Sequence, residues 1–273
     1  MPTKEHEEKV FTIDELNLEM IKCPAGSFMM GSPESESGRE ECEKQHKVII
    51  SKSFYIGKYP VTQKQYQAII GINPSFFMSD YSNQTIGCNN KRINLITNEN
   101  NPVDSVNWNN AKELCEILNA RFNNIIPQGY RFDLPTEAQW EYACRSGTTT
   151  SLSFNSEKNI INSEFEYTNL DEVAWYYENS GGQTHEVGQK CPNNWGIYDM
   201  LGNIREWCRD WSGNCLEDNV TDPTGPNHGF DRVIRGGSWD DFAHICRPAY
   251  RGSWPGNWKD KRFGFRLALV PMD

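Results

Sequence analysis

The sequence predicts an α+β fold in one domain. Helical spacing of apolar residues is confined to residues 62–147, short strand-like segments lie on both sides of it, and long polar connections join these elements. Segregated helices and strands are typical of α+β domains, whereas α/β proteins alternate them. A chain of 273 residues is long enough for one large domain or two small ones, and such a chain buries roughly 70–75% of its unfolded surface.

The N-terminal part of the chain is polar and then becomes strand-like. We expect a flexible arm at residues 1–13 and a single domain at 14–273. Segments 20–21 and 27–30 flank a Pro-Ala-Gly turn, which predicts a hairpin. Short apolar segments predict the other strands, at residues 48–50, 54–56, 174–176, 196–198, 233–235 and 265–268.

A capping box marks the start of the first predicted helix. The Thr62 hydroxyl can accept a hydrogen bond from a first-turn amide, and the Gln65 side chain can reach back to the Thr62 amide. The helix is predicted to continue through about Ile70, where Gly71 can end it.

Two further helices follow a polar, Asn-rich stretch at residues 79–100. The first runs from about Asn107 to Phe122, with apolar positions at helical spacing. The next begins with a second capping box, formed by Thr136 and Gln139. Its expected end is near Gly147, a residue suited to a left-handed helix cap.

The charge balance disfavours nucleic acid as a partner. The chain carries 37 acidic and 27 basic side chains, a formal net charge of −10, whereas phosphate binding needs a basic face. No apolar run approaches 18 residues, so no transmembrane segment is predicted. The N-terminus does not resemble a signal peptide, and this fits either a cytoplasmic protein or a secreted one without its leader or lipid anchor.

The nine cysteines contain no CxxC pair, which disfavours a zinc knuckle. Cys115 and Cys144 lie in helical patterns beside apolar residues, so we expect buried free thiols there. Cys208 and Cys215 are close enough in sequence to close a small disulfide loop, although spacing alone does not fix that geometry.

The C-terminal segment at residues 236–268 has the most unusual composition. It opens with GGSW, closes with GFRLA, and between these motifs mixes aromatic residues with Asp and Arg. The aromatic residues follow no period of 2 or 3.6, which favours a displayed surface over a core element. Aromatic side chains and Arg provide contact energy at low entropic cost. Ordinary core packing is the alternative interpretation.

Ordered motifs run along most of the chain, from about residue 14 to 270. They are GSFMMG at 26–31, YPVT at 59–62, PV at 102–103, LPTEAQWEYA at 134–143, GIYDMLGN at 196–203, EW at 206–207, RGGSW at 235–239 and GFR at 264–266. Together they resemble the formylglycine-generating enzyme (sulfatase-modifying factor) family. The resemblance implies a variant of the C-type lectin fold, with little regular structure and long loops.

The resemblance extends only partly to the family's catalytic residues. Its enzymes hold copper(I) with two cysteines after the GGS motif, and copper(I) needs soft thiolate ligands. Here the second position is Cys246, the first is Asp241, and Arg205 stands where the enzymes commonly have Trp. We therefore expect a protein that is not an enzyme and requires no cofactor, with Cys246 as a small buried side chain.

Residues 232–268 resemble the variable proteins of diversity-generating retroelements, which have the same fold. Those proteins carry diversified positions between an RGGSW-like motif and a closing GFRLA. The resemblance implies a display protein at the cell surface, with a variable region at 236–263 that binds a protein or another surface ligand. We expect a monomer. The expected ligand-binding residues are Asp240, Asp241, Phe242, His244, Ile245, Tyr250, Gly252, Ser253, Trp254, Trp258, Lys259, Asp260 and Phe263. Three arginines, Arg247, Arg251 and Arg266, are expected to support the scaffold.

Codon chemistry is compatible with this interpretation. Such systems mutate template adenines, often in AAC codons, and substitution of those adenines can give Asp, Phe, His, Ile, Tyr, Gly or Ser. Each of these residue types occurs between residues 240 and 253. Trp254 and Trp258 require a different codon.

A calcium site is a further implication of the resemblance. Asp199, Gly202, Ile204 and Glu206 match a calcium-binding pattern of the family, and two carboxylates with two backbone carbonyls are suitable hard ligands. The alternative is that the two carboxylates bind surrounding turn amides. His185, His228 and His244 have no companion at metal-ligand spacing, and we interpret them as surface or turn residues, with His244 in the binding region.

Two other function classes remain open at this point. One is an enzyme of the parent family with non-copper chemistry, which requires a reactive Cys246. The other is an accessory protein with one fixed partner, for which replacement of residues 240–263 destroys a single interaction.

Overall fold

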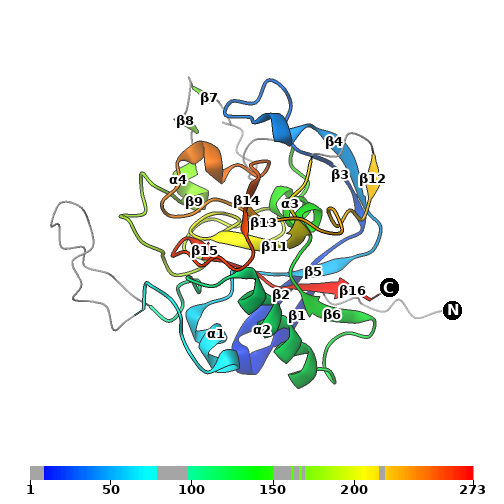
Figure 1. Cartoon of the computed structure of the whole chain (residues 1–273), viewed down its shortest axis with the longest axis vertical. Helices are drawn as coiled ribbons and strands as arrows, with labels where there is room; N and C mark the ends of the chain where they lie inside the picture. The colour runs from blue at the N-terminus through cyan, green and yellow to red at the C-terminus, as the bar shows by residue number, and fades with distance from the viewer. Residues whose placement is uncertain are drawn as a thin grey trace.

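The computed structural model describes residues 9–78, 98–149, 161–162, 166–167, 170–214 and 219–272. Figure 1 shows α1 and α2 packed at one end against a five-stranded sheet, with the remaining sheets and α3 beyond it. The described helices and strands are segregated and not alternating, which confirms the predicted α+β class. The described residues include no helix with the length and apolar character needed to cross a membrane.

The five-stranded sheet has the order β1-β2-β5-β16-β6, and its strands pair antiparallel. Its strands are Val10–Ile13 (β1), Leu18–Cys23 (β2), Phe54–Gly57 (β5), Tyr130–Asp133 (β6) and Ala268–Pro271 (β16). The C-terminal strand therefore lies between two strands from the first half of the chain. Residues 10–13, which we placed in the N-terminal arm, are a strand of this sheet, and residues 1–8 lie outside the described residues.

The predicted hairpin across the Pro-Ala-Gly turn is wrong. Strand β2 pairs with β1 and β5, whereas β3 (Gly26–Met30) pairs with β4 (His46–Ile50) in a separate three-stranded sheet with β12 (Val220–Thr221). The two faces of β2 contact different cores: Leu18 and Met20 belong to one, whereas Cys23 belongs to the same core as Met30 of β3. The turn therefore connects strands of two different sheets.

The three predicted helices are confirmed to within about a residue at their ends. They are α1 (Gln63–Ile70), α2 (Trp108–Arg121) and α3 (Glu137–Arg145). Both predicted capping boxes form, at Thr62 and at Thr136, and Asn107 caps α2 in the same way. Gly71 ends α1 in the left-handed region, and Ser146 does so for α3 one residue before the expected Gly147. A short helix at Leu170–Val173 (α4) was not predicted.

A four-stranded sheet, β14-β13-β11-β15, carries the C-terminal region. Its strands are Arg205–Trp211 (β11), Asp231–Arg235 (β13), Gly252–Pro255 (β14) and Phe263–Gly264 (β15). Short strands complete the described part of the chain: Ile161–Asn162 (β7), Glu166–Tyr167 (β8), Ala174–Trp175 (β9) and Leu201–Gly202 (β10). Residues 196–198 and 265–267, which we predicted as strand, are irregular, although Phe265 is fully buried.

Candidate ligand-binding surface

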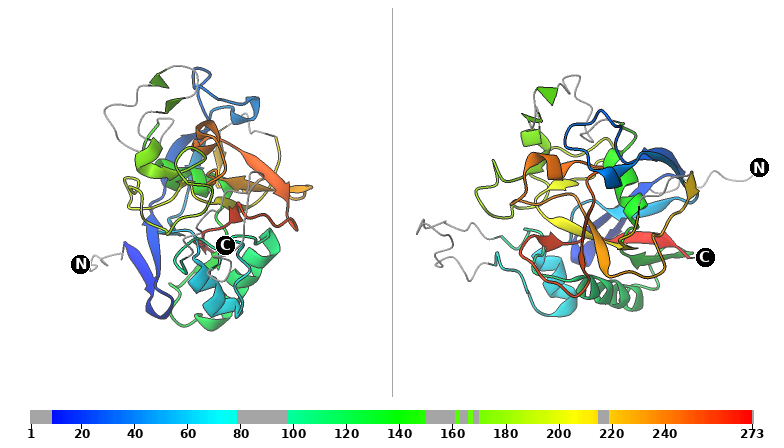
Figure 2. Two further views of the ribbon diagram at one scale, coloured as in Figure 1. Left: turned by 90° about the vertical axis from the view of Figure 1, so that its left-hand side faces the viewer. Right: turned by 45° about the horizontal axis from the view of Figure 1, so that its top comes forward.

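The segment between β13 and β15 is held at both ends by the four-stranded sheet. Gly236 and Gly237 follow β13 with φ of 95° and 71°, a region that favours glycine. The chain then forms a short 3-10 helix at Ala243–Cys246 and returns along β13 as β14, which Figure 2 shows beside the other strands of this sheet. Strand β15 closes the segment by pairing parallel with β11. Strand pairing thus fixes residues 252–255 and 263–264, and turn hydrogen bonds, such as Ile245 N to the Phe242 carbonyl and Trp258 N to the Pro255 carbonyl, hold the backbone between them.

A buried ion pair supports the start of the segment. Arg205 Nε donates to Asp241 Oδ2 at 2.7 Å, and Arg205 Nη2 also binds Asp241. Ser238 Oγ donates to the same Oδ2 at 2.7 Å. The side chains of the ion pair are only 10% and 6% exposed, respectively. Asp241 is therefore a supporting residue, which differs from its predicted role in ligand contact.

Several of the predicted binding residues face solvent. Phe242 and Trp258 are each 52% exposed, and Asp240 and Lys259 are exposed as well. His244, Ile245, Tyr250, Ser253 and Asp260 are partly buried. Asp260 forms an ion pair with Arg262, with Nε 2.8 Å from Oδ1. Each of these side chains is therefore at least partly accessible for contact with a ligand.

Three other predicted binding residues belong to the scaffold. Phe263 is 1% exposed and packs edge-on against Trp207 and Trp254, whose ring centroids lie at 5.4 and 5.6 Å. Trp254 itself is partly buried against the same core. At Gly252, an added Cβ would lie 3.0 Å from Ile234 Cγ1, so a side chain there is crowded. Because the sequence of this segment follows no clear period, it did not indicate which of its side chains face inward.

Tyr177 joins this surface from a distant part of the sequence. It is 56% exposed, and its ring centroid lies 4.9 Å from that of Phe242. The Tyr177 amide donates to the Asp241 carbonyl at 2.9 Å, which holds the two segments together. A single exposed aromatic residue in a loop gives no sequence signal for such a contact. We use the name exposed aromatic face for the exposed side chains of this segment together with Tyr177, and among them Tyr177 and Phe242 are in ring contact: Tyr177, Asp240, Phe242, Trp258 and Lys259.

The scaffold role of the three arginines is confirmed by their ion pairs. Arg247 binds Glu36 and Glu43 and is fully buried. Arg251 binds both oxygens of Glu137, at 2.7 and 2.8 Å. These contacts tie the C-terminal segment to residues more than 100 positions earlier.

The four residues of the expected calcium site do not fit a calcium ion. Both oxygens of the Glu206 carboxylate accept from Arg266 at 2.8 Å, and one also accepts from Trp140 Nε1 at 2.6 Å. Arg266 Nη2 further donates to the carbonyl of Asp199. The guanidinium thus neutralises the carboxylate that a calcium ion would need. Asp199 accepts from the Gly188 amide, and burial raises the pKa of its carboxyl to about 6.

The residues around Cys246 do not fit a copper(I) site. A second thiolate is missing because the matching position is Asp241, whose carboxylate is bound to Arg205. Cys246 is fully buried, and burial raises the pKa of its thiol well above the usual range. Cys115, Cys144 and Cys208 are likewise buried free thiols, and Cys215 lies outside the described residues. Among the described residues, no group of three His, Cys, Asp or Glu side chains could hold a metal ion.

The histidines occupy different environments. His185 stacks on Trp175 at a centroid distance of 3.8 Å, and its Nε2 lies 2.7 Å from the Ser180 carbonyl. Burial lowers the pKa of its imidazole. His228 is exposed, and His244 stacks at 6.3 Å on Phe242 beside the exposed aromatic face. His185 thus lies in a loop, as we expected of a turn residue, but its ring is partly buried against Trp175 and not on the open surface.

Comparison with known proteins identifies relatives over nearly the whole chain. The sequence model of the "Sulfatase-modifying factor enzyme 1-like domain" family matches residues 7–270. The chaperone protein LppX of Paenibacillus barcinonensis is 32% identical over 253 residues, which is 81% of each chain. The structure of Treponema denticola variable protein 1 matches with a TM-score of 0.75 and 30% identity, covering 96% of this chain and 99% of that one. PvdO from Pseudomonas aeruginosa matches with a TM-score of 0.77 and 26% identity, covering 95% and 97%.

Proposed function

The chain belongs to the sulfatase-modifying factor family, and we propose that it uses this C-type lectin-like fold to bind a ligand and not to catalyse a reaction. The proposal places the contact on the exposed aromatic face, with side-chain variation between residues 240 and 259 setting specificity. The similarity to Treponema denticola variable protein 1 over almost the full length supports it. The expected partner is a protein or another surface molecule outside the cell.

The observation that carries the proposal is the contrast between backbone and side chains in one segment. Strand pairing at residues 252–255, turn hydrogen bonds at Phe242 and Trp258 and the Arg205–Asp241 ion pair hold the main chain, while Phe242 and Trp258 each leave about half of their surface exposed. A preformed backbone loses little entropy when it binds, so side chains there can change without a refolding cost. Large exposed aromatic residues are also frequent binding anchors.

The replacement of a copper ligand supports binding over oxidase chemistry. Asp241 and Arg205 are the two departures from the family's catalytic pattern, and in this protein they bind each other. A carboxylate neutralised by arginine is a poor ligand for copper(I), which prefers thiolates. The proposal therefore assigns this position to the support of the binding surface.

A comparison of two libraries tests the proposal. One library randomises Asp240, Phe242 and Trp258, and the control library randomises Asp241, Gly252 and Phe263. We expect most clones of the first library to fold, as measured by thermal unfolding, and some to bind new proteins in a display selection. Most control clones should fail to fold. A first library that mostly misfolds, or folds but never yields a binder against any of a broad panel of surface proteins, would contradict the proposal.

A further inference from the structure

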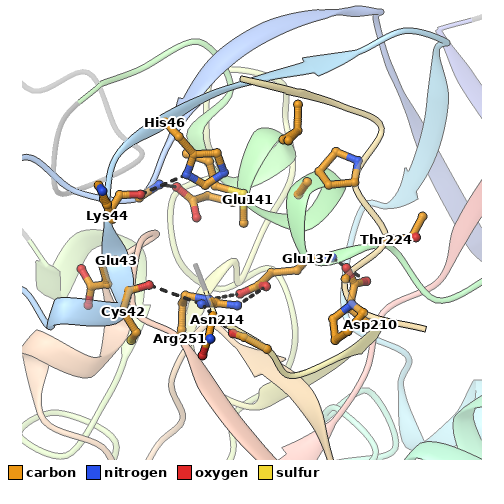
Figure 3. Close-up of a pocket in the computed structure, with 18 of the residues that line it drawn as sticks. Cys42, Glu43, Lys44, His46, Glu137, Glu141, Asp210, Asn214, Thr224 and Arg251 are labelled. Atoms are coloured by element: carbon orange, nitrogen blue, oxygen red, sulfur yellow. Dashed lines mark hydrogen bonds and ion pairs between the residues drawn. The ribbon is translucent and has the colours of Figure 1, made fainter. Parts of the chain in front are cut away.

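A cavity of about 470 Å³ lies between the first turn of α3, strands β3 and β4, and the loop that follows β11. Figure 3 shows it with Glu137 and Arg251 at its centre and His46 and Asp210 in its walls. Of residues 240–263, only Arg251 lines it, so the cavity is separate from the exposed aromatic face. Its volume falls in the range of small-molecule sites. Much of the lining is apolar, from Met30, Ala138, Trp211, Val220, Pro223 and Pro226.

Four carboxylates line the cavity, and three of them are neutralised by arginine. Glu43 binds Arg247, Glu137 binds Arg251, and Glu141 binds Arg235 and Arg145. Asp210 forms no ion pair with any residue that the structure describes. Its Oδ2 accepts a hydrogen bond from the Glu137 amide at 3.0 Å, and the side chain is buried. A buried carboxylate without a cation is costly unless a partner supplies the charge.

His46 adds a second acceptor to the cavity wall. Its Nδ1 lies 3.0 Å from the Lys44 carbonyl, and because a carbonyl only accepts, Nδ1 must carry the proton. The Nε2 atom of the neutral ring is then an acceptor. His46 is 8% exposed, and its Nε2 has no hydrogen-bond partner among the described residues. Buried polar atoms are usually paired, so an orphaned one indicates a missing donor.

Arg251 and the first-turn amides of α3, the donors that an anion would use at the centre of the cavity, are already engaged, which disfavours an anionic ligand there. Arg251 donates to both oxygens of Glu137 and to the Cys42 and Gly213 carbonyls. The first-turn amides of α3 bind Asp210 and the Thr136 hydroxyl. A ligand that matches Asp210 and His46 donates hydrogen bonds and carries positive charge.

We propose that this cavity binds a small organic amine. Its ammonium group pairs with Asp210, and its apolar body packs against Trp211, Val220 and the two prolines, while His46 Nε2 is a further acceptor in the cavity wall. The site is independent of the exposed aromatic face, so either assignment can fail without the other.

Calorimetry with two matched probes tests this proposal on the intact protein at pH 8. Benzylamine carries the ammonium group, and benzyl alcohol has a similar shape without the charge. We expect benzylamine to bind with a Kd of about 1 mM or tighter and benzyl alcohol at least about tenfold more weakly. Equal binding of the two probes, or no binding of benzylamine, overturns the proposal.

Variants locate the charge that the amine recognises. Asp210→Asn keeps the size of the side chain and removes its charge, so benzylamine affinity should fall at least about tenfold. Asp231→Asn makes the same change on β13 outside the cavity and should leave binding unchanged. An Asp210→Asn protein that folds and binds benzylamine as tightly as the parent overturns the proposal.

A labelling measurement on the unaltered protein serves if Asp210→Asn does not fold. Cys42 lines the cavity and is partly exposed, whereas Cys191 is exposed and lies outside it. Bound benzylamine should slow the reaction of iodoacetamide with Cys42 and leave the rate at Cys191 unchanged. Equal rates at Cys42 with and without saturating benzylamine would place the amine elsewhere and overturn the proposal.

Discussion

Arg205 and Asp241 form a bidentate ion pair beneath the exposed aromatic face, with Arg205 Nε 2.7 Å from Asp241 Oδ2. In sequence these residues are 36 positions apart, and each departs from the catalytic pattern of the family. The two departures are in contact: the carboxylate at 241, where the enzymes have a cysteine, binds the guanidinium at 205, where they commonly have Trp. In this protein the two positions form a buried ion pair.

Removal of one partner of this pair should be strongly destabilising. Asp241→Leu leaves the Arg205 guanidinium buried without a counter-charge, and we expect a loss of about 3 kcal/mol in the free energy of unfolding. The double variant Arg205→Met/Asp241→Leu removes both charges and should lose less. Denaturant unfolding measures both, with Asp240→Leu on the exposed neighbour as the control. A single variant as stable as this control would show that the pair is dispensable.

Truncation of an exposed aromatic residue should change the free energy of unfolding much less than truncation of a buried one. Phe242→Ala and Trp258→Ala remove side chains that are about half exposed, so each should change the free energy of unfolding by less than about 1 kcal/mol. Phe263→Ala empties a core position and should cost about 3–5 kcal/mol. Thermal and denaturant unfolding compare the three variants. A large loss at Phe242 or Trp258 would mean that the surface supports the fold.

Cys246 should not react in the native protein. Its side chain is fully buried, and an atom added at Gly237 would come within 2.6 Å of its sulfur, so no reagent can approach from that side. Burial also raises the pKa of the thiol, which lowers its thiolate fraction. Iodoacetamide followed by peptide mass spectrometry should therefore label exposed Cys191 and leave Cys246 unlabelled.

Unfolding in guanidinium chloride is the control, because Cys246 should then react like the other cysteines. Rapid labelling of Cys246 in the folded protein would revive the interpretation of this chain as an enzyme with non-copper chemistry.

The pH dependence of stability should carry a contribution from Asp210. Burial and the nearby Glu137 carboxylate raise the pKa of Asp210 to about 7 from an ordinary value of 3.8, while the hydrogen bond from the Glu137 amide and the charge of Arg209 oppose the shift. The folded state therefore binds the proton more tightly than the unfolded state. This contribution is fully present below about pH 4 and is lost as the pH rises through 7.

Asp210→Asn removes this contribution, so the difference in stability between the variant and the parent should shift in favour of the variant from pH 5 to pH 8. Urea unfolding at the two pH values measures it. The raised pKa values of Asp104 and Asp199 act in the same direction but are shared by both proteins, so they cancel in the difference. A difference that does not change with pH would show that Asp210 titrates normally.

Local sequence signals predicted the helices and several strands but not the pairing of the strands. The capping boxes at Thr62 and Thr136 involve residues three positions apart, so they can be read directly from the sequence. Strand β11 was missed because nearly all of its residues are buried, which removes the alternation that marks a half-exposed strand. The separation of β2 from β3 depends on their strand partners, β1 and β5 for β2 and β4 for β3, which only the folded chain defines.

The candidate surface was predicted only in part for the same reason. The sequence located the segment, and Phe242 and Trp258 are exposed as expected. It could not separate Asp241 and Phe263 from their exposed neighbours, because the partners of these two residues come from β11. Tyr177 and the cavity beside Asp210 depend on contacts between distant segments and left no local pattern.

Variation of the exposed side chains between residues 240 and 259 on a fixed scaffold can be read from the DNA that follows the coding region. We expect a near-copy of the codons for residues 232–268, with mismatches only at template adenines and a reverse transcriptase gene nearby. Mismatches should fall on codons for exposed residues such as Phe242 and Trp258 and spare those for Arg247 and Arg266. The absence of such a copy would contradict the proposal and show that this protein has a fixed binding specificity.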